Sequence, residues 1–356
     1  MAGRAAGDVQ QDVLRALWVG GVAESEEVDA LATDDVHLLG DWKDLQGANV
    51  MGLDEALDLI GLYQRRAYGE VRWNPSPSGS VSITSYHCWR AAAEEWVPAY
   101  DEWFGRCRAI AVTKGDQQLP DLARGVASRL TSALRAVDEV RGLHQVGQGD
   151  LGGGDWPGTA DSVMMFTWSA FDVLARAADR IFDLQSPRAV LGWQKDSWRK
   201  RLHQAPNGQR LAELSAPGTP HHGLVKVLSR LRNGIHQAPY GRGGYSESFI
   251  EPPESVLMLT DGEIEPIRDM LGEHPAWFRS KVEGVESMPH EPWLVAAVPL
   301  VEWLVVTSFH VLNDLIEVMS DGLPDPPPDH IRAHSLINKG DNRDRIRALV
   351  GPLPST

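Results

Sequence analysis

The clearest chemical pattern in the chain is a short polar run, residues 232–236, with the sequence RNGIH. It lies near the end of a helix predicted from His221 to just before Pro239. Residues four apart share one face of a helix, so Arg232 and His236 are neighbours. An arginine can hold a phosphate and stabilise its transition-state charge. A histidine can exchange the proton of a ribose hydroxyl, so the two residues together could cleave RNA without a metal ion.

Basic residues surround this run, although the whole chain is acidic. Residues 185–245 contain ten Lys and Arg against two acidic residues, whereas the formal net charge of the chain is −15. That net charge argues against a general nucleic-acid binder, but a local basic segment can attract a polyanion. A chance run of cations on solvated helix faces explains the segment equally well, as helix capping or simple exposure does for its histidines. The candidate phosphate-binding residues are Arg230, Lys226, Arg242 and His222.

The region Thr84–Ser320 resembles the HEPN domain, a helical fold that contains many RNases of toxin–antitoxin, phage-defence and RNA-processing systems. The residues that carry the resemblance are Leu231–His236, near the end of one helix and after a long helix predicted over Thr159–Leu184. The family pattern is an Arg, usually followed by a polar residue such as Asn, and then a His after four to six intervening residues. The resemblance implies an all-α bundle, often a homodimer in which the motifs of two chains face each other.

The spacing in this chain departs from the family pattern. Three residues separate Arg232 from His236, while five separate Arg230 from His236 and place Leu231 at the polar position. The resemblance implies that Arg232 binds the phosphate and that His236 transfers protons. It also implies that Asn233 orients these two side chains and that Arg230 assists. Which of the two arginines is catalytic stays open.

The function that follows is a metal-independent endoribonuclease, acting as a defence or stress toxin. RNA, a second copy of the chain and an antitoxin or defence protein are the implied partners. A catalytically inactive HEPN-like scaffold that binds protein or RNA is the alternative.

Helices are predicted to position these residues. The expected fold class is all-α with at most a short β element: an acidic N-terminal helical extension at 1–75, a HEPN-like helical domain at 82–320, and a Pro-rich break with a polar tail at 321–356. A short strand is predicted at Val256–Thr260 and a flexible loop at 241–244. The predicted helices are Asp8–Val19, Asp54–Tyr68, Thr84–Val112 with a kink at Pro98, Pro120–Leu143, Thr159–Leu184, short helices within Arg188–Arg210, His221 to before Pro239, Asp261–Gly272 and Trp293–Met319.

The longest apolar stretch, Trp293–Leu312, is about long enough to span a bilayer. Glu302 at its centre and Pro299 favour a buried core helix instead, so no membrane partner is predicted. A buried carboxylate is costly without a counter-charge, so Glu302 should have an arginine or histidine partner. The N-terminus lacks a signal-peptide pattern and the chain has two cysteines, which is too few for a disulfide framework, so a cytoplasmic location is expected.

No cofactor and no metal site is predicted. Cys88 and Cys107 lack the paired spacing that a zinc site needs. His330 and His334 are four apart and could share a metal on a helix, but they follow a Pro-rich break, so a surface tail is the better interpretation. The sequence at 147–152 matches G-x-G-x-x-G, but it follows a helix rather than a strand, so a linker is the better interpretation.

Overall fold

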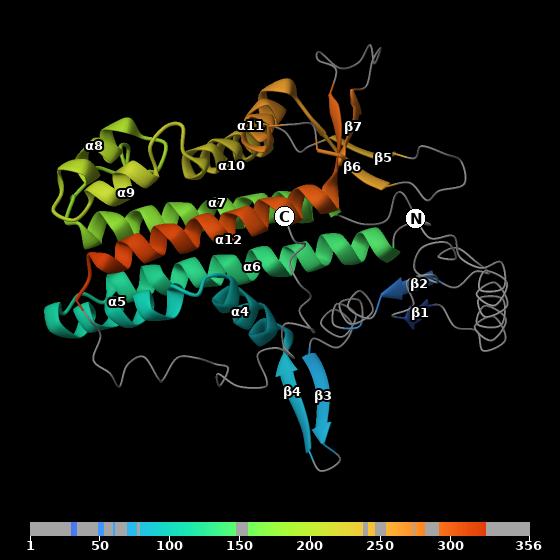
Figure 1. Cartoon of the computed structure of the whole chain (residues 1–356), viewed down its shortest axis with the longest axis horizontal. Helices are drawn as coiled ribbons and strands as arrows, with labels where there is room; N and C mark the ends of the chain where they lie inside the picture. Colours follow the sequence, from blue (N-terminus) through green and yellow to red (C-terminus); the bar gives the residue numbers. More distant parts are fainter. Residues whose placement is uncertain are drawn as a thin grey trace, which may run out of the picture. The chain divides into compact units, whose positions relative to one another are not determined.

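The computed structural model describes residues 30–33, 49–52, 60, 70–76, 79–146, 156–237, 241–245, 254–272, 275–281 and 292–324 (Figure 1). The chain divides into two compact units. The first comprises residues 1–82 with 344–352, and the second comprises residues 83–343 with 353–356.

The described residues of the first unit, apart from Ile60, form strands that were not predicted. Strand β1 (Ala30–Thr33) pairs in parallel with β2 (Asn49–Gly52), and β3 (Glu70–Ser76) pairs with β4 (Gly79–Thr84), which leads into the second unit. In β3, Val71 and Trp73 alternate with charged residues, a pattern typical of a strand. The predicted helix Asp8–Val19, and the predicted helix Asp54–Tyr68 apart from the single helical residue Ile60, lie outside the described residues.

The second unit is mostly helical, as predicted. The break between α4 and α5 falls at Pro98, where a kink was expected. The predicted short helices after Arg188 are α8 and α9. The helices described in this unit are α4 (Ser85–Trp96), α5 (Tyr100–Lys114), α6 (Gln118–Val146), α7 (Trp156–Ile181), α8 (Asp196–Gln204), α9 (Gln209–Leu214), α10 (Pro220–Gln237), α11 (Asp261–Leu271) and α12 (Ala297–Asp321).

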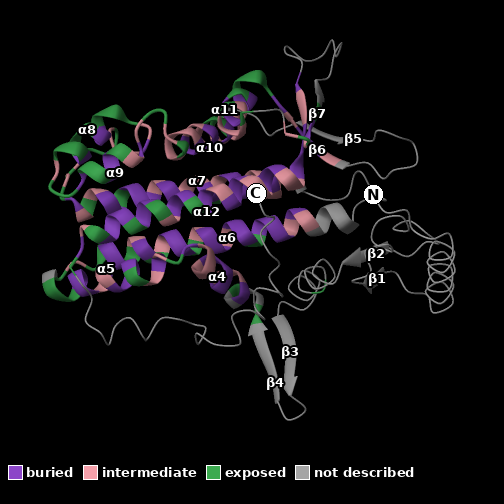
Figure 2. Cartoon of the chain, viewed as in Figure 1, coloured by how far each residue is buried: buried purple, intermediate pink, exposed green. Residues whose placement is uncertain are grey.

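The core lies around α12, which packs against α4, α5, α6 and α7. Figure 1 shows the long helices α6, α7 and α12 running alongside one another, and Figure 2 shows buried residues along all three. By length and composition alone α12 could cross a membrane, but most of its apolar window is buried inside the bundle, as for the core helix of a soluble protein. Glu302 has the arginine partner that was predicted, because it forms an ion pair with Arg141 of α6.

The second unit also contains a four-stranded sheet, which is more β structure than the sequence suggested. The sheet has the order β5-β6-β8-β7, and each neighbouring pair of strands is antiparallel. The predicted strand at Val256–Thr260 is confirmed as β6, but the predicted flexible loop at 241–244 is β5. The strands are β5 (Gly241–Tyr245), β6 (Glu254–Leu259), β7 (Phe278–Lys281) and β8 (Trp293–Ala296).

The start of the last helix was also predicted wrongly. Residues 293–296 form β8, and α12 begins at Ala297. Val295 pairs with Leu257 of β6, and both side chains are fully buried. Cross-strand pairing of apolar residues therefore holds this segment extended, directly before the helix.

Candidate functional site

Helix α10 positions the polar run through its apolar stripe. Leu224, Val227, Leu228 and Leu231 are fully buried, and the helix packs on α7 and α11. Because a residue turns about 100° around the axis, the side chains of residues four apart differ by about 40° and those two apart by about 160°. Arg232 and His236 therefore share one side of α10, whereas Arg230 projects from almost the opposite side.

The side chain of Arg232 is only partly exposed. Its Nη1 donates a hydrogen bond to Oδ1 of Asn233 at 3.2 Å, and its buried Nε has no hydrogen-bond partner among the described residues. Asn233 and His236 are exposed. His236 makes no hydrogen bond with any residue that the structure describes, so its ring is available to a ligand.

The positive charge of Arg232 acts on Asp172 of α7. Burial raises the pKa of Asp172 above its usual range. The nearby charges of Arg232, Arg176 and Arg129 oppose that rise, as does a hydrogen bond that the indole N–H of Trp168 donates to the carboxyl. Three arginines from three helices thus act on one carboxyl. We call Arg129, Arg176 and Arg232 the arginine cluster.

The cluster carries more positive charge than Asp172 can balance. Within the described part of the chain, none of the three arginines forms an ion pair with Asp172. Trp168, Asp172 and Arg176 are spaced four apart, so they follow one face of α7. Trp168 is partly exposed and Arg176 is exposed. The surface around Asp172 therefore combines spare positive charge with an accessible aromatic ring.

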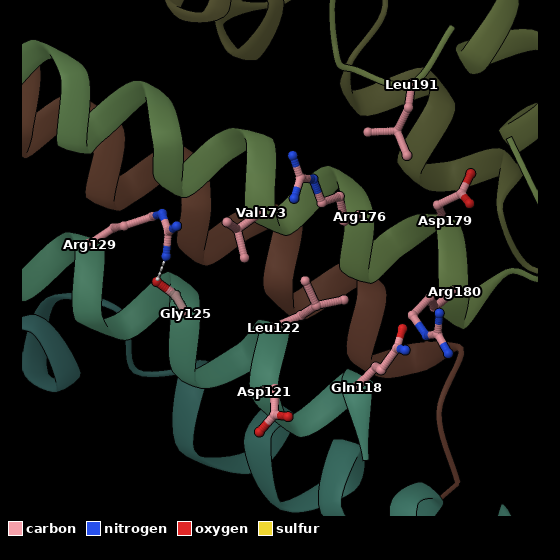
Figure 3. Close-up of a pocket in the computed structure, with 10 residues that line it drawn as sticks. All are labelled: Gln118, Asp121, Leu122, Gly125, Arg129, Val173, Arg176, Asp179, Arg180 and Leu191. Carbon is pink, nitrogen blue, oxygen red and sulfur yellow. Dashed lines mark hydrogen bonds between the residues drawn. The ribbon is translucent and has the colours of Figure 1, made fainter. Parts of the chain in front are cut away.

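Arg129 is held in place from α6. Its Nε donates to Oγ of Ser169 at 2.6 Å, and its Nη1 donates to the carbonyl of Gly125 at 2.9 Å. The second bond is the dashed line in Figure 3. Arg176 has no hydrogen-bond partner among the described residues. One arginine of the cluster is thus fixed and another is free to move towards a ligand.

A pocket of about 530 Å³ adjoins the cluster between α6 and α7, and we call it the α6/α7 pocket. Arg129 and Arg176 line it, with the apolar side chains of Leu122, Val173 and Leu191 (Figure 3). Its size lies within the range typical of small-molecule sites. The arginine cluster therefore borders a cavity rather than a flat surface.

The predicted phosphate-binding residues do not all lie beside Arg232. Lys226 forms an ion pair with Asp269 of α11, with its Nζ 3.3 Å from Oδ2. His222 lies about 15 Å along the axis of α10 from Arg232. Burial lowers the pKa of His222, and so does the charge of Arg199, whose Nη1 is 3.5 Å from Nδ1. The backbone of Arg242 lies in β5, and its side chain is outside the described residues.

The basic segment at 185–245 does not form one patch. Arg199 is buried and pairs with Asp196, while Arg210 pairs with Asp321 at the end of α12. Of the three arginines that act on Asp172, only Arg232 belongs to this segment, whereas Arg129 and Arg176 come from α6 and α7. A usable signal was present in α7, where Asp172 and Arg176 are four apart on the polar face, but nothing local to α6 marked Arg129.

Among the described residues, no group of three His, Cys, Asp or Glu side chains could hold a metal ion. The side chains gathered around Asp172 and on α10 supply guanidinium, imidazole, carboxyl and indole groups. Comparison with known proteins gave no significant match to a family model, to a curated protein or to a solved structure.

Proposed function

We propose that this protein binds single-stranded RNA at the arginine cluster and cleaves it without a metal ion, in the manner of a HEPN endoribonuclease. The observation that carries the proposal is the excess charge around Asp172, next to an exposed histidine on the same side of α10 as Arg232. Arginine is the side chain best suited to phosphate, because its planar fork can donate two parallel hydrogen bonds.

In the proposed reaction, Arg232 holds the non-bridging oxygens of one phosphate. The imidazole of His236 accepts the proton of the neighbouring 2′-hydroxyl, and the 2′-oxygen attacks phosphorus. The bond to the 5′-oxygen breaks, that oxygen takes a proton from the imidazolium, and a 2′,3′-cyclic phosphate remains. Asn233 steadies Arg232 through the hydrogen bond between their side chains. The side of α10 from which each residue projects favours Arg232 over Arg230 as the phosphate ligand.

Cleavage of a mixed RNA pool in EDTA tests this proposal. His236→Ala should reduce the cleavage rate by about a hundredfold or more, the usual contribution of a general acid–base group. Arg232→Gln should have a similar effect, and Arg230→Gln a smaller one. Arg210→Gln is the matched control, because Arg210 is an exposed arginine of the same basic segment that pairs with Asp321. Equal cleavage by the wild type and His236→Ala would refute catalysis at α10.

A scaffold that binds RNA without cleaving it is the second candidate. The observation that favours it is the spacing of three residues between Arg232 and His236, which is shorter than the HEPN pattern. RNA binding that depends on Arg232, without cleavage by the wild type, would support the scaffold. A defence or stress-toxin role, a homodimer and an antitoxin or defence partner belong to this proposal through the HEPN resemblance alone. A cytoplasmic location stays a prediction from the sequence.

A further inference from the structure

The charges that line the α6/α7 pocket are not equally available. Arg180 makes a two-pronged interaction with Asp116, with its Nη2 3.0 Å from Oδ2. Asp121 pairs with Arg124 at 2.7 Å. After these pairs are formed, Arg129 and Arg176 are the lining cations that have no carboxylate in contact within the described residues.

One lining carboxylate also has its own partners. The oxygens of Asp179 accept hydrogen bonds from the indole N–H of Trp198 at 3.3 Å and from the backbone N–H of Ser186 at 3.2 Å. These bonds tie the carboxylate to the loop after α7 and to α8. An anion entering the pocket would therefore meet Arg129 and Arg176 as the lining cations that form no ion pair among the described residues.

A glycine keeps the pocket open beside Arg129. A Cβ atom at Gly125 would lie 3.3 Å from Nη1 of Arg129 and 3.3 Å from Cγ1 of Val173, which is tighter than most contacts of this kind. A side chain at position 125 would therefore crowd both Arg129 and Val173. The space is thus shaped by residues of both helices.

We propose that the α6/α7 pocket binds one nucleotide unit. Arg129 and Arg176 hold its phosphate, and the base lies against Leu122, Val173 and Leu191. The combination of an apolar wall with two guanidinium groups that form no ion pair among the described residues, in a cavity of about 530 Å³, suits a flat ring that carries a phosphate better than a purely ionic or purely apolar ligand.

The pocket and the α10 site share the arginine cluster. Arg129 and Arg176 line the pocket, and both act, with Arg232, on Asp172. This part of the inference rests on the proposed function: the bound unit is a nucleotide of the RNA chain next to the phosphate at Arg232. A free mononucleotide offers the same chemistry, so the experiment must separate the two sources.

The test is calorimetric titration of the full-length protein with adenosine 5′-monophosphate, adenosine, inorganic phosphate and a short single-stranded oligoribonucleotide. The monophosphate should bind at least tenfold more tightly than adenosine or phosphate alone. If the pocket serves RNA, the oligonucleotide should bind at least tenfold more tightly again; equal affinities would assign the pocket to the free mononucleotide.

Two variants locate the binding. Arg176→Gln should weaken monophosphate binding about tenfold, the loss expected for one charge-assisted contact. Gly125→Ala should weaken it as well, although alanine is the better helix former, because the new methyl group displaces Arg129. Arg124→Gln is the matched control on α6 and should stay within twofold, because Arg124 is exposed and already paired with Asp121. No monophosphate binding, or the same affinity in Arg176→Gln as in the wild type, would overturn the inference.

Cleavage kinetics separate this inference from the proposed function. Arg176→Gln should raise KM about tenfold and leave kcat within twofold, whereas His236→Ala should lose kcat and keep monophosphate binding. If His236→Ala abolishes cleavage and Arg176→Gln leaves KM unchanged, the proposed function stands and the pocket assignment fails. If the wild type does not cleave but binds the monophosphate through Arg176, the pocket assignment stands and the proposed reaction fails.

Discussion

Two carboxylates in the bundle lie near arginines of α6, and they differ in how many arginines act on them and in whether an ion pair forms. Glu302 of α12 has one arginine, Arg141, in direct ion-pair contact. Asp172 of α7 has the charges of Arg129, Arg176 and Arg232 around it without an ion pair to any of them in the described part of the chain. One cation and one anion balance each other's charge, whereas three cations near one anion leave positive charge that a ligand can neutralise. The ratio of charges thus distinguishes a structural site from a candidate binding site.

The largest effect is expected when the balanced pair is broken. Arg141→Met should lower the free energy of unfolding by about 2 kcal/mol, because it leaves the Glu302 carboxylate without a counter-charge where its side chain is only 15% exposed. Urea denaturation measures this change. Arg141→Met combined with Glu302→Leu should recover most of the loss, since apolar residues can replace a buried pair. If the double variant were less stable than the single one, the charge-balance argument would fail for this pair.

The next largest effect is expected in the dependence of RNA affinity on salt concentration. If the three arginines contact about three phosphates, RNA affinity should fall about 20-fold between 50 and 200 mM KCl, from a slope of roughly −0.7 per phosphate. Fluorescence anisotropy with labelled RNA measures this slope. Arg176→Gln should reduce its magnitude by about 0.7, and Arg124→Gln should not change it. A wild-type slope near zero would show that the excess charge does not meet phosphates.

Trp168 should contribute to binding as a stacking surface. Trp168→Leu should weaken RNA affinity about tenfold, within the range measured for stacking of a base on an aromatic ring. Trp168→Phe keeps a ring but loses the N–H donated to Asp172, so it should retain most of the affinity. Trp277→Leu is a suitable control, because Trp277 is also partly exposed but packs near Trp303 of α12. Equal losses in the Leu and Phe variants would point to the hydrogen bond rather than to stacking.

Removing the carboxylate at the centre of the cluster should strengthen RNA binding. Asp172→Asn takes away a negative charge that repels phosphate, so affinity at pH 7 should rise about threefold. Binding measured between pH 7 and pH 4 adds a second check, because the wild type should gain affinity as pH falls through the pKa of Asp172. The variant should lack that part of the pH dependence. Weaker binding by Asp172→Asn would indicate that Asp172 positions the arginines instead of opposing the ligand.

The smallest expected effect is on the way the stability of the fold depends on pH. Because burial raises the pKa of folded Asp172 above its value in the unfolded chain, the folded state binds the proton more tightly. The resulting stability is fully present below the unfolded pKa of about 3.9 and is lost as pH rises through the folded pKa. Asp172→Asn should therefore lose less stability than the wild type between pH 4 and pH 7 in thermal denaturation. Parallel curves for the two proteins would contradict the raised pKa.

Local patterns were sufficient for much of the bundle. The apolar stripe of α10 fixed its buried side, and the Arg232–His236 spacing then placed those two residues on one face. The proline at position 98 also marked a real boundary, and α11 begins at Asp261, as predicted.

Features that depend on distant partners were not predictable in this way. Residues 241–245 are rich in glycine, and they form a strand because their backbone pairs with the edge of β6. Residues 293–296 continue into an apolar helix, so periodicity could not separate the strand from the helix. Arg129 joins the cluster only because α6 packs on α7, about a hundred residues before Arg232 in the chain.

The central helix is also the last helix described in the second unit. During synthesis, the apolar faces of α4 and α5 emerge about 200 residues before α12, which covers them. At roughly 5–20 residues per second, those faces stay uncovered for about 10–40 s on the ribosome. The order of elements along the chain therefore leaves the parts of α4 and α5 that face α12 uncovered until the final helix is made, whereas α6 can pack on both helices earlier.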